Sequence, residues 1–252
     1  MRVSTNTPAW IFRSVGWALF LSLVLQPDWF SPLWSTLNDA GVDPIYHADR
    51  VATLTLWHLA LSLIATAVST LGAVSLAIVV TRPSWSHERA FLESLLRLAQ
   101  AIPPVVVLAL VIPTLGFGNL PTLCALVLYG LLPIFERTVT GLEAVPQPVL
   151  LAARGMGMTD GQRLWRVELP LARPAILEGV RLSLTISIGT ATLGSTVAAK
   201  SLGELILAGL YSNNNAYLVQ GALICGLMAM LVYDLCRWLE QRWSVQWGST
   251  AT

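Results

Sequence analysis

Two long stretches without a charged residue limit what this chain can fold into. Neither residues 54–80 nor residues 98–135 contain Asp, Glu, Lys or Arg. A helix of about 20 apolar residues crosses the ~30 Å hydrocarbon core of a bilayer, and a soluble core could not bury runs of this length. Because 55% of the 252 residues are hydrophobic and only 12% are charged, we predict an all-α integral membrane protein.

The apolar segments predict about six transmembrane helices. They are residues 9–26, 54–80, 98–135 (two helices), 182–199 (entered from about Pro174) and 216–235. The glycines, asparagine and proline of Thr114–Pro121 divide the long third segment, which predicts a helical hairpin. Pro103 and Pro104 are expected to kink its first helix. No small-residue cleavage site follows the first segment, so we interpret it as a retained helix rather than a signal peptide.

The basic residues predict the orientation. If the N-terminus is cytoplasmic, only Arg50 and Lys200 lie outside, and most arginines lie at or near the inner face, as the positive-inside rule requires. These inner arginines are Arg2, Arg82, Arg89, Arg97, Arg137, Arg154, Arg163, Arg166, Arg173, Arg181, Arg237 and Arg242. Both termini are then cytoplasmic. The predicted regions are an N-terminal helix with an outer loop (1–53), a core (54–236) with its longest cytoplasmic loop at about 136–173, and a cytoplasmic tail (237–252).

The long cytoplasmic loop contains an organised segment, AARGMGMTDGQRLWRVELP, at residues 152–170. Residues 149–154 are predicted to form a short helix, and Gly155 and Gly157 permit a sharp turn after it. A loop that only fixed the topology would need basic residues, but it would not need two short helices joined at glycine.

A second short helix is predicted to follow this turn. Thr159 and Gln162 have the spacing of a capping box, and Asp160 suits the positive end of a helix. Pro170 is expected to end this helix, because proline lacks the backbone N–H that a helix interior needs.

The segment resembles the cytoplasmic loop of permease subunits of binding-protein-dependent ABC importers, whose pattern is E-A-A-x3-G-x9-I-x-L-P. Val167 is a conservative fit for the isoleucine, whereas Leu151 occupies the position of the glutamate. The resemblance implies the ABC importer permease (MetI-like) fold and a loop that docks on an ATPase. The residues predicted to couple to the ATPase are Ala152, Ala153, Arg154, Gly157, Arg163, Arg166, Leu169 and Pro170.

Residues 54–233 are similar to the osmoprotectant (glycine betaine/carnitine/choline) branch of these permeases. LTLWHL, AIPPVVVLALVIPTLGFGNLPTLCALVLYGLLPI and GTATLGSTVAAKSLGELILAGL occur in the order of that branch, although KSLGEL replaces its usual GGLGDL. An altered substrate or neutral drift would explain Lys200.

The resemblance implies the partners of the chain. They are ABC ATPase subunits that bind ATP-Mg, a soluble substrate-binding protein, a second permease (an identical copy or a sister chain) and the lipid bilayer of the bacterial inner membrane. No nucleic acid, metal or cofactor of its own is implied, and G-x4-G-K-[ST], the phosphate-binding motif of ATPases, is absent from the sequence.

The fifth predicted helix carries small and hydroxylated residues in two stripes. Ser183, Ser187, Thr190 and Gly194 are the candidate translocation path, beside a second stripe of Thr185, Gly189, Thr192 and Thr196. Such residues also permit close packing of helices, and the two interpretations are compatible. His58 is an intramembrane ionisable residue, which has either a functional role or hydrogen bonds within the bundle.

Three other functions remain as alternatives. A membrane enzyme would need convergent catalytic or metal-binding residues, but His47, His58 and His87 lie in different segments and no catalytic residue is predicted. A self-sufficient channel or secondary transporter would usually place acidic residues or broken helices near the membrane midplane, and the uncharged centres of the predicted helices argue against this class. An ABC permease for an amino acid or another betaine would share the same motifs.

Overall fold

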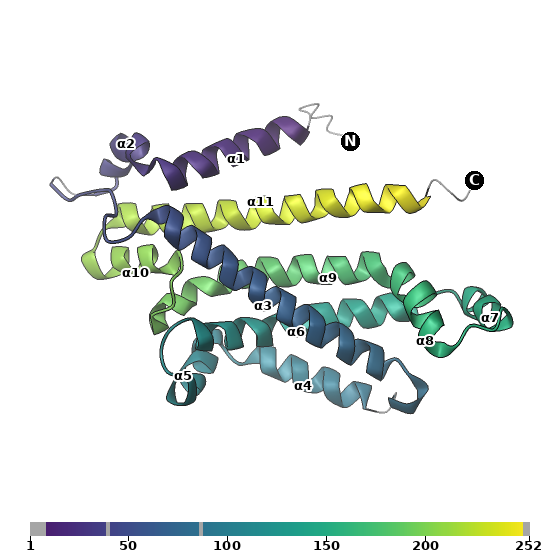
Figure 1. The fold of residues 1–252 in the computed structure, drawn as a ribbon. Helices are drawn as coiled ribbons and strands as arrows, with labels where there is room; N and C mark the ends of the chain where they lie inside the picture. Colours follow the sequence, from purple (N-terminus) through teal and green to yellow (C-terminus); the bar gives the residue numbers. More distant parts are fainter. Residues whose placement is uncertain (1–8, 39–40, 86–87, 249–252) are drawn as a thin grey trace, which may run out of the picture.

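The computed structural model describes residues 9–38, 41–85 and 88–248, and every regular element in these ranges is helical. Arg2 and His87 lie outside them. Figure 1 shows an elongated bundle in which α3 crosses α6 and α9, and α1 runs beside α11. The prediction of an all-α membrane protein is confirmed.

Helices in the structure cover most of each predicted apolar segment, but the described helices give four or five spans and a shorter apolar helix where six spans were predicted. Of the described helices, four are long and apolar enough to cross a membrane. They are α3 (Val51–Val80), α6 (Asn119–Glu143), the continuous helical stretch Asp160–Val197 and α11 (Asn215–Gly248). The pair α4–α5 forms a fifth span if it is counted as one. The N-terminal helix α1 (Ala9–Leu25) is shorter but apolar, and it packs against α11.

The third predicted span is broken rather than merely kinked. Helix α4 (Arg89–Ala101) and helix α5 (Pro104–Leu115) are bent by 93°. Ile102 and Pro103 between them have extended ψ angles of 125° and 140°. A residue that precedes proline is driven out of the helical region, and here two successive residues precede a proline, so the helix ends and restarts.

The predicted hairpin between the third and fourth spans is confirmed. Helix α5 ends at Leu115 and α6 begins at Asn119, within the predicted segment Thr114–Pro121. Gly116 and Gly118 have φ angles of +74° and +114°, which glycine adopts without steric cost. The N–H of Gly118 donates to the carbonyl of Val197 over 2.6 Å, which fastens this turn to the end of the fifth span.

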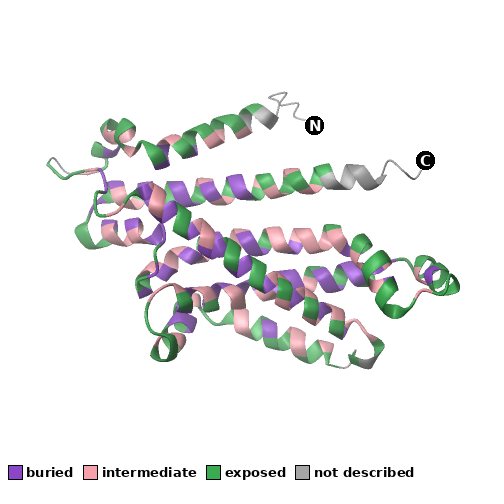
Figure 2. Cartoon of the chain, viewed as in Figure 1, coloured by how far each residue is buried: buried purple, intermediate pink, exposed green. Residues whose placement is uncertain are grey.

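The centre of the bundle is the contact of α6 with α3 and α9, where buried residues concentrate in Figure 2. Gly130 of α6 shows how close the helices are. A β-carbon there would lie 2.6 Å from the hydroxyl oxygens of both Ser69 and Ser183, so a larger residue would force these side chains to shift. Small residues that allow such approach are typical of helix packing in membranes.

The outer loop before α3 is held against α11 by side chains of that helix. Tyr217 donates to the carbonyl of Ile45 over 2.9 Å, and Gln220 donates to the carbonyl of Pro44 over 2.8 Å. Tyr46 donates to Glu204 of α10 (Gly203–Ser212) over 3.1 Å. Burial and the carboxylate of Glu204 raise the pKa of Tyr46 to about 12, so this hydroxyl stays protonated at neutral pH. The predicted outer loop is therefore part of the packed structure.

Candidate functional site

The predicted cytoplasmic loop forms two short helices that project from one end of the bundle. Helix α7 (Gln147–Gly155) and helix α8 (Asp160–Arg163) lie at the same end as the first residues of α1 and the last residues of α11 (Figure 1). Helix α6 continues to Glu143, so the loop proper begins later than residue 136. Most of α7 is exposed (Figure 2), except Ala153, which is buried.

The turn between α7 and α8 has the geometry that its glycine and its cap predict. Gly157 has a φ of +76°, and its N–H donates to the carbonyl of Arg154 over 2.9 Å. Thr159 and Gln162 form both hydrogen bonds of the predicted capping box, at 3.0 and 3.3 Å. The turn therefore fixes the direction in which α7 leaves the rest of the chain.

The prediction that Pro170 ends the second short helix is wrong. Pro170 lies in the first turn of α9 (Leu169–Thr190), and the helix runs on from Asp160. A π-helical turn, η3 (Leu164–Glu168), comes directly before it, in which the N–H of Leu169 donates to the carbonyl of Leu164, five residues earlier. Local π geometry accommodates a proline inside a helix because it rearranges the hydrogen bonds around the missing donor.

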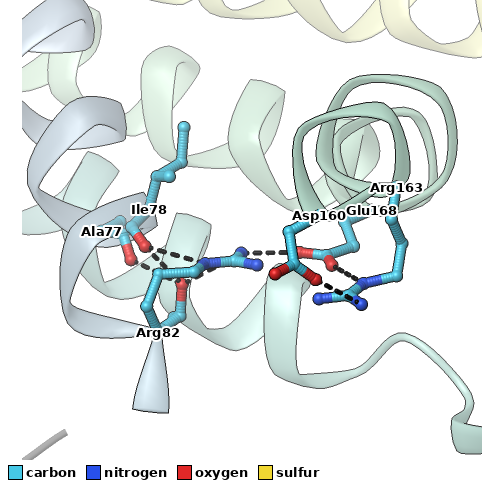
Figure 3. A network of polar contacts seen from close by, with 7 residues as sticks. Ala77, Ile78, Arg82, Asp160, Arg163 and Glu168 are labelled. Carbon is cyan, nitrogen blue, oxygen red and sulfur yellow. Dashed lines mark hydrogen bonds and ion pairs between the residues drawn. The ribbon is translucent and has the colours of Figure 1, made fainter. Parts of the chain in front are cut away.

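A network of ion pairs lies where this helix meets the C-terminal end of α3 (Figure 3). Glu168 accepts from Arg82 over 2.6 Å with one carboxylate oxygen and from Arg163 over 2.8 Å with the other. Arg163 also pairs with Asp160 over 2.9 Å. The side chains of Arg163 and Glu168 are 9% and 7% exposed. Arg163, one of the predicted coupling residues, is therefore buried and joins Asp160 and Glu168 within the loop.

Several large apolar side chains of this region lie on its outside. Leu151 is 62% exposed, and Met156 and Trp165 are each 71% exposed. Arg154 and Arg166 are exposed as well. We call these five residues the coupling surface. Of the predicted coupling residues, Ala152 and Gly157 are also exposed, whereas Ala153 and Leu169 are buried or half-buried. Met156, Trp165 and Glu168 were not among the predicted coupling residues.

The candidate translocation residues lie mostly inside the subunit. Ser183 and Ser187 are buried, and Ser183 packs against Gly130 of α6. Gly194 is buried against Thr122, whose methyl group would lie 2.5 Å from an added β-carbon. Thr190 is partly exposed. In this conformation, Ser183, Ser187 and Gly194 therefore form helix contacts, which is the packing interpretation. On the second stripe, Gly189 and Thr196 are exposed.

A charged cavity of about 510 Å³ opens beside α4, α6 and α9. Arg97 and Glu136 on its wall are paired at 2.9 Å. Arg89, Glu93 and Arg137 also line it. The cavity therefore presents both signs of charge on its wall.

His58 is buried and bonded at both ring nitrogens. Its Nδ1 accepts from the N–H of Leu202 over 3.2 Å, so Nε2 carries the proton and donates to the carbonyl of Ile188 over 2.7 Å. His58 therefore joins α3 to α9 and to the segment that precedes α10, which is the hydrogen-bonding role left open by the sequence. Lys200 lies 3.3 Å from Asp49 at the outer end. Within the described ranges, no three His, Cys, Asp or Glu residues are arranged to hold a metal ion.

Comparisons with known proteins agree with this architecture. Residues 73–245 match the family model "Binding-protein-dependent transport system inner membrane component". The permease of the methionine ABC transporter MetNI, in an inward-facing structure, is similar in fold, with a TM-score of 0.66 and 19% identity over 74% of this chain and 93% of that one.

Curated relatives cover most of the chain. The osmoprotectant import permease protein OsmY of Salmonella typhimurium is 34% identical over 232 residues, which are 92% of this chain and 95% of the relative. The choline transport system permease protein OpuBB of Bacillus subtilis is 36% identical over 69% of this chain and 80% of its own length. The carnitine transport permease protein OpuCB of Listeria monocytogenes is 36% identical over 73% of this chain and 84% of its own length. This chain belongs to the family of inner membrane components of binding-protein-dependent transport systems, and it is a permease subunit of an ABC importer.

Proposed function

We propose that this chain forms the membrane path of an ATP-driven importer for a quaternary-amine osmoprotectant such as glycine betaine, choline or carnitine. The observation that carries this proposal is its similarity, over nearly its whole length, to a permease named for osmoprotectant import, together with relatives named for choline and carnitine transport. The substrate would reach the chain from a soluble binding protein.

The coupling surface is the proposed contact with an ATPase subunit, which binds ATP-Mg. Leu151, Met156 and Trp165 expose large apolar side chains on a part of the chain that projects from the bundle. Burying apolar surface is the main favourable term in most protein association, so such residues suit a docking site. Leu151 supplies apolar contact where the family pattern has a glutamate.

The motion of the ATPase would pass from the coupling surface into the membrane helices. The helical stretch runs without a break from α8 through the π-turn and α9 into the 3-10 helix η4 (Ala191–Val197), so a displacement of the loop would move α9 as a rigid body. An ordinary flexible linker would absorb such a displacement.

The translocation path would run along the exposed side of α9, between this subunit and a second permease copy or sister chain. Gly189 and Thr190 of α9 and Thr196 of the following 3-10 helix η4 are at least partly exposed, and the charged cavity would be the inner part of the path. Ser183, Ser187 and Gly194 would enter the path only if α9 turned away from α3 and α6.

The proposed orientation has both termini in the cytoplasm of a bacterial cell, with several crossings of the inner membrane. The ends of α1 and α11 that are nearest to the termini lie toward the same end of the bundle as α7 (Figure 1). The excess of arginines in the segments assigned to the inner face supports a cytoplasmic position for this end. The coupling surface would then face the ATPase.

Reconstitution tests this function. Proteoliposomes that contain the chain, its ATPase and its binding protein are expected to accumulate labelled glycine betaine, choline or carnitine only with ATP-Mg on the ATPase side. Uptake without the ATPase would contradict the proposal and favour a secondary transporter. Uptake of methionine but of none of the three quaternary amines would agree with an ABC importer and would contradict the proposed substrate.

A further inference from the structure

Glu168 connects the loop that carries the coupling surface to a second membrane helix. Its chain continues directly into α9, whereas its carboxylate pairs with Arg82, which follows the last turn of α3. Arg82 is itself fixed to α3, because its Nε donates to the carbonyl of Ile78 over 3.2 Å. Figure 3 shows the arginines approaching the carboxylate from opposite sides.

The π-turn explains why Glu168 can pair with Arg163. In an α-helix, residue i+5 lies about 140° around the axis from residue i, so the two side chains would diverge. In a π-turn the hydrogen bond joins residues i and i+5, which brings positions five apart onto the same face. Arg163 and Glu168 are five apart, and the π-turn Leu164–Glu168 lies between them.

Burial gives the pairs their rigidity. The Glu168 side chain is 7% exposed and its two oxygens accept from two different guanidinium groups. Exposed ion pairs contribute little because water competes for both groups and the side chains stay mobile. A buried carboxylate held by two arginines has one favourable position, and removal of one partner leaves an uncompensated charge.

We propose that Glu168 is a positioning residue that locks the coupling loop to the inner end of α3, so that the ATPase moves α3 and α9 as one body. This inference rests on the proposed coupling function. Without the lock, the loop would still dock on the ATPase through Leu151, Met156 and Trp165, but only α9 would follow its motion. Less substrate would then be transported for each ATP hydrolysed than in the wild-type transporter.

The test compares uptake per ATP hydrolysed in proteoliposomes, with glycine betaine, choline and carnitine as probes. The wild-type transporter must first show ATP-dependent uptake; if it does not, the proposed function fails before this inference is reached. Glu168→Gln and Arg82→Gln are each expected to lower the ratio about tenfold while the ATPase still co-purifies. Arg82→Lys, which keeps the positive charge, is expected to retain the ratio within about twofold.

A double-mutant cycle and a control separate positioning from general stability. If the two residues act as a unit, Arg82→Gln with Glu168→Gln together lose no more coupling than either change alone. Arg13→Gln, which breaks the ion pair of α1 with Asp234 of α11, is expected to leave the ratio unchanged. If Glu168→Gln does not fold, the comparison of Arg82→Gln with Arg82→Lys decides. Wild-type ratios in the single variants, additive losses in the double variant, or loss of the bound ATPase would overturn the proposal.

Discussion

The Nε2 atom of His58 lies 2.7 Å from the carbonyl oxygen of Ile188, and this hydrogen bond joins the first part of α3 to the last turn of α9. The same ring accepts from the N–H of Leu202, so one side chain connects α3, α9 and the segment that precedes α10. All three groups are buried. His58 thus links three segments of the bundle through two buried hydrogen bonds.

Replacing His58 is expected to cost stability rather than transport chemistry. His58→Ala leaves the buried N–H of Leu202 without its acceptor, and leaves the carbonyl of Ile188 with only the weak hydrogen bond from Cys225 Sγ at 3.7 Å. The expected cost is about 1–3 kcal/mol. Thermal unfolding of the detergent-solubilised protein measures this loss. Ser62→Ala, which removes only a bond to a carbonyl one turn earlier in the same helix, is the control and should change stability little. If His58→Ala unfolds like wild type but transports nothing, the residue has a direct role in transport.

Gly157 is expected to be required for coupling through its backbone angle. Its φ is +76° and a β-carbon there would meet no atom within 4 Å, so a larger residue would be strained but not obstructed. Gly157→Val costs about 1–2 kcal/mol in this conformation and should abolish ATP-dependent uptake while insertion into the membrane stays intact.

Gly155→Ala is the matched control for that change. Gly155 also has open space around it but no left-handed φ, so the alanine variant should transport normally. Gly157→Asn should fall between the two, because asparagine tolerates left-handed angles better than valine. Normal uptake by Gly157→Val would contradict the role of the turn.

Trp165 is expected to contribute to ATPase binding. Trp165→Ala removes the large apolar side chain from the coupling surface and should lower the amount of ATPase that co-purifies, since exposed tryptophans at interfaces often dominate binding. Trp85→Ala changes another exposed tryptophan, 51% exposed, in the short helix that follows α3. That control should retain the ATPase. Equal losses from both variants would argue against a specific docking site.

The start of α10 is expected to tolerate no side chain at Gly203. A β-carbon there would lie 1.9 Å from the carbonyl oxygen of Thr192, a backbone atom that cannot rotate away. Gly203→Ala should therefore destabilise the folded protein by about 1–3 kcal/mol, as overpacking does, or prevent folding. Gly226→Ala on α11, where a β-carbon meets nothing within 4 Å, is the control in the same unfolding assay. Equal stability of the two variants would disprove the close contact.

The features predicted correctly are those that neighbouring residues decide. The capping box of Thr159 and Gln162 and the hairpin before Asn119 depend on spacing and on glycine within a few positions. Pro170 shows the limit of that reasoning. The effect of this proline on the helix depends on the hydrogen bonds of the preceding turn. A π-turn that accommodates a proline cannot be recognised from the hydropathy pattern.

Contacts between residues far apart in the chain could not be predicted from local sequence patterns. Glu168 and Arg82 are 86 positions apart, and nothing in either local pattern indicates that they meet. The stripe that contains Ser183 and Ser187 was visible, but small hydroxylated residues serve helix packing and wet passages equally well. Only the position of α6, with Gly130 against Ser183, shows which of these roles the residues have in this conformation.

The central claim, that the coupling surface binds an ATPase, is tested most directly by site-specific photo-crosslinking in the membrane. A photoreactive amino acid at Leu151 is expected to form a crosslink to the ATPase subunit, whereas the same amino acid at Leu33, exposed at the opposite end of the bundle, is expected to form none. A crosslink from position 33 to the ATPase, or its absence from position 151 in an actively transporting complex, would contradict the account.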